Sequence, residues 1–171
     1  EAMSKYLETG DMQKVDEKLS AILTSYQKDF SKHADTSDIK RIQYVWESIP
    51  SQLAKENRKF VYQLVKTGAR AREYEDAIYW LKNAGLVHQI FCVDTPNLPL
   101  SAYKNLSAFK IYLNDVGLLR RISDLPSSVF VSQNPAFKEY KGALAENYVL
   151  QRLICQMNKE PYYWTSNYSA E

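Results

Sequence analysis

Glu146 is the residue of this sequence whose position most invites a chemical role. It lies in KGALAENYVLQRLICQM, residues 141–157. At about 100° per residue, the apolar positions of this segment form one broad helical stripe, and Glu146 falls near its middle. The stripe consists of Ala145, Val149, Leu150, Leu153, Ile154 and Met157, and the polar side carries Asn147, Gln151, Arg152 and Gln156.

A carboxylate on an apolar face must be paired, protonated or held near a cation. Glu146 is therefore a candidate catalytic residue and metal ligand. A structural ion pair with Lys110, Lys138 or Arg152 is the simpler explanation, and we favour it slightly.

Basic residues concentrate in one stretch of the chain. Between Ser37 and Arg72 there are eight lysines and arginines and three acids, although the whole chain has a net charge of only +2. Such a block can contact phosphate, but a solvated helical surface explains it equally well. The candidate nucleic-acid-binding residues are Arg58, Lys59, Lys66, Arg70, Arg72 and Lys82.

Composition narrows the class of protein. The 171 residues are 45% hydrophobic and 25% charged, which is ordinary for a globular protein of one domain or two small ones. No apolar run approaches the roughly 20 residues that span a bilayer, and no signal peptide is present, so we expect a cytoplasmic protein without membrane contact. Cys92 and Cys155 are expected to be buried free thiols. Glycine-rich phosphate loops and the G-x-S-x-G and H-E-x-x-H motifs are absent from the sequence.

The hydrophobic pattern predicts a mostly α-helical α+β fold. Helices are expected over 12–30, capped by Asp11, over 37–48, capped by Ser37, and over 70–83, stopped by Gly85. Pro50 should end the second helix or open a short third one. Strands are expected over 86–94 and 108–115, and Asp115 reads as a turn residue or a helix cap. Three helices followed by a two-stranded ribbon is the order of a winged helix. After residue 119 we expect loops, then the Glu146 helix, then a strand in PYYWTS.

The last helix of the winged-helix-like unit argues against sequence-specific DNA recognition. Its first half, REYEDA, contains Glu73, Glu75 and Asp76, which would repel phosphate where such helices usually contact bases. Nonspecific DNA contact remains open, and a packing or protein-contact role is favoured.

Several motifs together resemble a known family. SIPSQLAKENRKFVYQLVKTGARAREYEDAIYWLKNAGLVHQIFCVDTPNLPL, FKIYLNDVGLL, KGALAENYVLQRL and YYWTSNYSAE occur in this order. They resemble the C-terminal half of bacterial and archaeal AAA-type ATPases, a region catalogued as domain of unknown function 4143. The resemblance covers about 19–171. It implies a P-loop ATPase domain upstream in cis, with ATP and Mg²⁺ bound there, and a chain cut at both ends.

The resemblance also implies a division of the chain into three parts. Residues 1–36 would be a helical tail of the ATPase domain, 37–119 a winged-helix-like module, and 120–171 the start of a restriction-endonuclease-like α/β domain. In that nuclease core a helix glutamate, matched by Glu146, joins an aspartate and a Glu-x-Lys pair around a divalent metal. Ser169-Ala170-Glu171 resembles the lead-in to the aspartate. With at most one metal ligand, this piece is expected to be no enzyme and to hold no cofactor.

We therefore expect a non-catalytic accessory region of an ATP-binding protein, which contacts a protein partner or nonspecific DNA. Two alternatives stay open: a metal-dependent nuclease-like domain that is incomplete here, and a winged-helix DNA-binding regulator.

Overall fold

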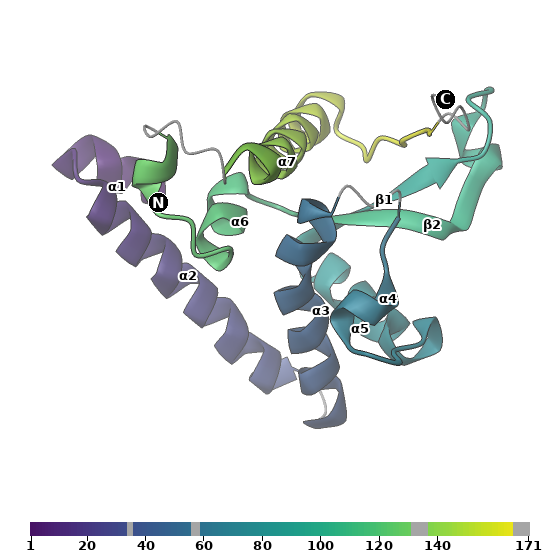
Figure 1. Ribbon diagram of the computed structural model, residues 1–171, viewed down its shortest axis with the longest axis horizontal. Coiled ribbons are helices and arrows are strands. Elements are labelled where there is room, and N and C mark those ends of the chain that lie inside the picture. The colour runs from purple at the N-terminus through teal and green to yellow at the C-terminus, as the bar shows by residue number, and fades with distance from the viewer. Residues whose placement is uncertain (34–35, 56–58, 131–136, 166–171) are drawn as a thin grey trace.

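The computed structural model describes residues 1–33, 36–55, 59–130 and 137–165, and it is mostly helical with one small sheet (Figure 1). The α-helices are α1 (Ala2–Thr9), α2 (Met12–His33), α3 (Thr36–Ala54), α4 (Tyr62–Val65), α5 (Ala71–Asn83), α6 (Val116–Ile122) and α7 (Lys138–Met157). The strands are β1 (Val87–Val93) and β2 (Lys104–Leu113), and two short 3-10 helices are η1 (Leu100–Tyr103) and η2 (Ser127–Phe130). The predicted mostly α-helical α+β class is confirmed.

The central helices carry the aromatic part of the core. Phe30 of α2 meets Trp46 of α3 and Trp80 of α5 edge-on, with ring centres 5.8 and 5.5 Å apart. Such edge-to-face pairs add about 0.5–1.5 kcal/mol each beyond their buried area. The prediction that Pro50 ends the second helix or opens a short third one is wrong, since α3 continues through it to Ala54. Ile49 and Leu53 on either side of Pro50 are buried, and this packing outweighs the lost backbone hydrogen bond.

The start of α3 also differs from the prediction. Ser37 was expected to cap this helix, but the helix already includes Thr36, so Ser37 lies inside its first turn. The Ser37 hydroxyl contacts the Asp38 carboxylate at 3.4 Å instead. The Asp11 cap of α2 is confirmed, because its Oδ1 accepts a hydrogen bond from the Gln13 N–H at 2.8 Å.

Strands β1 and β2 form an antiparallel ribbon, in which Val87 faces Leu113 and Phe91 faces Phe109. Gly85, with φ of 69°, makes the turn from α5 into β1 as predicted. On the outer edge of β2, the Phe60 N–H donates to the Phe109 carbonyl at 2.6 Å, which ties the chain before α4 to the ribbon. The element order α3, α4, α5, β1, β2 is the order expected for a winged helix.

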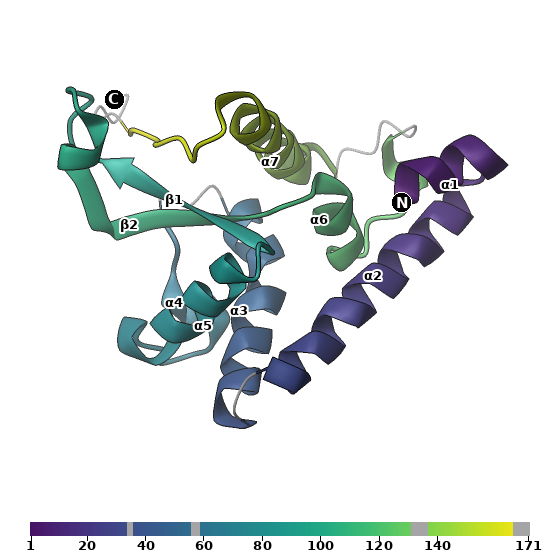
Figure 2. The same cartoon turned by 180° about the vertical axis from the view of Figure 1, so that it is seen from behind.

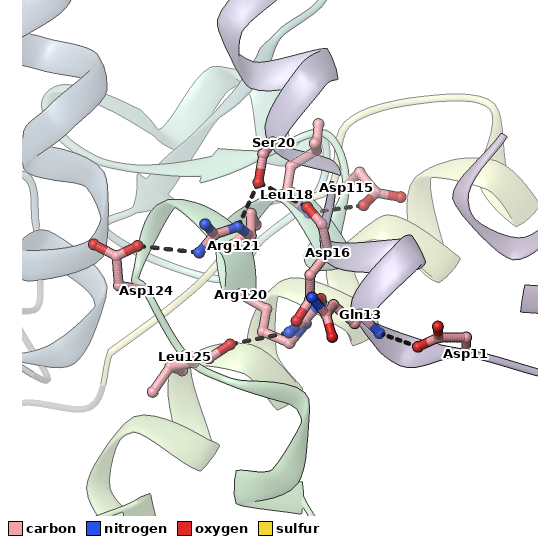
Figure 3. Close-up of polar contacts among 10 residues, drawn as sticks. All are labelled: Asp11, Gln13, Asp16, Ser20, Asp115, Leu118, Arg120, Arg121, Asp124 and Leu125. Carbon is pink, nitrogen blue, oxygen red and sulfur yellow. Dashed lines mark hydrogen bonds and ion pairs between the residues drawn. The ribbon is translucent and has the colours of Figure 1, made fainter. Parts of the chain in front are cut away.

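The short helix α6 fastens the N-terminal helices to the rest of the chain and extends beyond residue 119, where loops were predicted to begin (Figure 3). Asp115 caps it, since its Oδ1 accepts from the Leu118 N–H at 3.0 Å. Arg120 is buried and forms an ion pair with Asp16 of α2. Arg121 Nε donates to the Ser20 hydroxyl at 2.7 Å. The polar side of α2 is therefore held by two neighbouring arginines of α6.

Helix α7 lies on the opposite side of the ribbon from α4 and α5 (Figures 1 and 2). Its buried apolar residues Ala143, Leu144 and Leu150 belong to the same hydrophobic cluster as those of α2, α3, α5 and the ribbon. Of the predicted strand in PYYWTS, only a single parallel bridge between Tyr163 and Cys92 is found in the described part of the chain. None of the described helices is both long and apolar enough to cross a membrane.

Candidate functional site

Glu146 does not face the core. Its side chain is 48% exposed, and among the residues of α7 whose side chains are described, the buried ones are Ala143, Leu144, Asn147 and Leu150. The prediction that Glu146 lies in the middle of a buried apolar stripe is therefore wrong, because the helix is turned toward its asparagine. Val149, Leu153 and Met157, which that stripe included, are exposed.

Asn147 explains this orientation. Its side chain is fully buried, and it binds the end of β2 twice. Oδ1 accepts from the Leu113 N–H at 3.0 Å, and Nδ2 donates to the Leu113 carbonyl at 3.1 Å. An edge strand leaves such groups without a ladder partner, and leaving them buried and unpaired is costly. Gln151, one turn later, accepts from the Val116 N–H at 3.2 Å. The two amides face inward because they pair with the backbone between β2 and α6.

The carboxylate of Glu146 is held by two partners from β2. Its Oε1 accepts from Lys110 Nζ at 2.9 Å and from the Tyr112 hydroxyl at 2.7 Å. The first of the three predicted structural partners is thus confirmed. Arg152 is exposed and the side chain of Lys138 lies outside the described residues. Burial, together with the hydrogen bond to Glu146, raises the pKa of Tyr112 far above its usual value.

The segment after α7 completes this cluster. The Tyr163 N–H donates to the Phe91 carbonyl at 3.1 Å, and the Val93 N–H donates to the Tyr163 carbonyl at 2.9 Å. Lys110 Nζ lies 5.6 Å from the centre of the Tyr163 ring. Burial raises the pKa of Tyr163, and the neighbouring Cys92 raises it further. Lys110 therefore links the ribbon to both α7 and the segment that follows it.

Among the described residues, the cluster around Glu146 offers a metal ion a single carboxylate. No group of three or more histidines, cysteines or acids that could hold a metal ion occurs among the described residues. Ser169-Ala170-Glu171, the predicted lead-in to a second ligand, lies outside them. The geometry thus gives Glu146 a structural contact, and its role as a metal ligand or catalytic group stays a prediction. Cys92 is a buried free thiol as predicted, but Cys155 is exposed.

The predicted nucleic-acid-binding residues do not form one surface of free cations. Lys59, Lys66, Arg70 and Arg72 are exposed, and Arg58 lies outside the described residues. Lys82 is half-buried and its Nζ donates to Glu160 at 3.1 Å. Of the described members of this set, Lys82 thus forms an internal ion pair, and the other four are exposed.

The exposed face of α5 is acidic and aromatic. Tyr74, Ala77, Ile78 and Leu81 are buried, so the opposite face presents Arg72, Glu73, Glu75, Asp76 and Tyr79. Tyr79 is 67% exposed. Glu73 accepts a hydrogen bond from the Arg70 N–H at 2.9 Å and so helps to begin the helix.

A groove of about 600 Å³ lies between this face of α5 and the ribbon. We call it the α5–ribbon groove, and its lining includes Glu75, Asp76 and Tyr79 of α5, Tyr62 of α4, and Phe91 and Leu106 of the ribbon. Leu106 is 72% exposed. Burial, reinforced by the negative charge of Glu75, raises the pKa of Tyr62 to about 12. The hydrophobic pattern does not reveal this groove, and its only traces in the sequence are a tyrosine on the charged face of α5 and a leucine between Asn105 and Ser107.

Comparison with known protein families gives a match over most of the chain. Residues 1–129 match the model of a domain of unknown function, DUF8612. The chain belongs to this family. DUF8612 is a different domain from the one that the sequence motifs resemble, so the link to AAA-type ATPases stays a prediction. No curated protein and no solved structure matches the chain.

The DUF8612 match covers one of the two candidate regions and not the other. The α5–ribbon groove lies entirely within the matched residues, whereas Glu146 lies beyond them. A role shared by members of the DUF8612 family is thus better sought in the groove than at Glu146.

Proposed function

We propose that this chain is a non-catalytic accessory region that contacts a protein partner through the α5–ribbon groove. The observation that carries the proposal is the composition of the α5 surface. Glu73, Glu75 and Asp76 are exposed beside an open groove with apolar walls. A helix that enters a DNA groove needs cations or neutral donors there, because carboxylates repel the phosphates.

The accessory role within an AAA-type ATP-binding protein is supported by the sequence motifs described above. It predicts that the groove affects ATP turnover of the intact native protein. Charge reversal by Glu75→Lys should change its ATPase rate or the response of that rate to a partner, and Glu47→Lys, at an exposed position of α3, is the matched control.

DNA contact is the second candidate, because Lys59, Lys66, Arg70 and Arg72 are exposed near the start of α5. This candidate predicts salt-sensitive duplex binding that falls when these four residues are reversed in charge. Our proposal predicts weak duplex binding that the reversal leaves unchanged.

Photo-crosslinking distinguishes the candidates. Benzoylphenylalanine replaces Tyr79 in the groove or, as a control, Tyr148, which is also exposed but lies on α7. Irradiation in cells that produce the native polypeptide should give an adduct at position 79 that protease removes and nuclease does not. A nuclease-sensitive adduct would favour the DNA candidate. Labelling at position 79 no greater than at position 148 would contradict partner contact at the groove.

A further inference from the structure

We infer that the α5–ribbon groove binds a lysine or arginine side chain of a partner protein together with an adjacent apolar side chain. This inference rests on the proposed function and specifies the chemistry of the partner.

The charge of the groove is unbalanced. The described residues that line it include the carboxylates of Glu75 and Asp76 but no lysine, arginine or histidine. Neither carboxylate forms an ion pair or a hydrogen bond with any residue in the described part of the chain, in contrast to the paired acids Asp16, Glu146 and Glu160. Two adjacent unpaired carboxylates attract a cation, and removing them from water without one is unfavourable.

The aromatic residues favour the same ligand. Tyr79 and Tyr62 line the groove beside these acids, and the faces of tyrosine rings attract ammonium and guanidinium groups. The long alkyl stem of a lysine or arginine can lie on such a ring while its charged end reaches a carboxylate. The groove thus offers both parts that a basic side chain requires.

The remaining wall accepts an apolar side chain. Leu106, Phe91 and Phe109 of the ribbon line it, and Leu106 presents most of its surface to water. Lys104 Nζ already lies 3.6 Å from the centre of the Phe91 ring, so we assign this ring to the apolar part and not to cation binding. Burying this exposed apolar surface against a partner stabilises the complex. The two carboxylates make the groove selective for a partner that carries a positive charge.

Fluorescence anisotropy tests the inference directly. The probe is a short fluorescein-labelled peptide in which lysines alternate with leucines, and its control has norleucine in place of each lysine. We expect saturable binding of the lysine peptide to the full chain and at least about tenfold weaker binding of the norleucine peptide. Saturable binding that is equal for both peptides, or none for either, would overturn the inference.

Variants locate the binding on the protein. Glu75→Gln and Asp76→Asn should each weaken binding of the lysine peptide about three- to tenfold, and Leu106→Ser about fivefold. Glu47→Gln removes the same charge from an exposed position of α3 and should leave the affinity unchanged. All four residues are exposed, so circular dichroism should show an unaltered fold. Equal weakening by Glu47→Gln would mean that the peptide senses only the net charge, which refutes the assignment to the groove.

The outcomes separate this inference from the proposed function. A protein adduct at position 79 without any binding of the lysine peptide would refute the chemistry of the partner and leave partner contact standing. Absence of both would refute both. An adduct that mass spectrometry maps to a second copy of this chain would replace the partner by self-association.

Discussion

Replacement of Asn147 by leucine is the perturbation that most directly tests the orientation of α7. Leucine has the γ-branched shape of asparagine, although it is larger, and it can form neither hydrogen bond to Leu113. The variant therefore leaves one buried N–H and one buried carbonyl unpaired at the end of β2.

The expected loss follows from these two bonds. An unpaired buried backbone group costs about 1–3 kcal/mol, so the two together reduce the free energy of unfolding by about 2–6 kcal/mol. A domain of this size has about 5–15 kcal/mol in total. With an m-value of about 2 kcal/mol/M in urea, the unfolding midpoint should fall by about 1–3 M.

Urea unfolding followed by circular dichroism measures this shift. Gln156→Leu is the matched control, because it replaces an exposed amide on the same helix and should change stability by less than about 0.5 kcal/mol. The alternative orientation, with Glu146 inward, makes Asn147 a surface residue. Equal stability of the two variants would therefore refute the described orientation of α7.

Three further predictions concern other parts of the chain. Asp16→Asn should lower the unfolding free energy in urea by about 2–3 kcal/mol, because it leaves the buried Arg120 charge without its carboxylate and with only its hydrogen bond to the Leu125 carbonyl, and adding Arg120→Met should restore part of this loss. Burial lowers the pKa of His88, so its neutral form favours folding above pH 6.5, and this contribution is lost as pH falls from 6.5 through the lowered pKa. His88→Gln should accordingly make urea stability less dependent on pH in this window, and an unchanged dependence would refute the burial argument. Glu75→Gln should bring the pKa of Tyr62 from about 12 part of the way toward 10.0 in an NMR titration, since burial is the larger cause and remains.

The sequence predicted the fold where local pattern and packing agree. The apolar period of α5, the Gly85 turn and the alternation in β1 each have one simple structural solution, and all three were found. Helix α6 was missed because it has only seven residues and is stabilised by its contacts with α2, which lies about a hundred residues earlier. Local periodicity carries no information about such a partner.

The candidate site was predicted less well, for a physical reason. Pattern analysis assigns an asparagine to the surface, since burial of an unpaired amide is unfavourable. Asn147 is buried because a strand edge supplies both of its partners, and only the tertiary structure shows that edge. Because Asn147 faces the strand, the neighbouring Glu146 lies toward the exposed side of α7. A structural ion pair was predicted with Lys110 as one of three candidate partners, because a carboxylate and an ammonium group attract each other whether buried or exposed.

The boundary of the family match does not coincide with the boundary of the hydrophobic core. The match ends at residue 129, but Leu144 and Leu150 of α7 belong to the same packed cluster as the helices and ribbon before it. A polypeptide cut at this boundary would expose the apolar surface that they cover, together with the unpaired end of β2, and both features promote aggregation. Relatives without a helix equivalent to α7 therefore need a substitute, from elsewhere in their own chain or from a bound subunit, to cover the same surface.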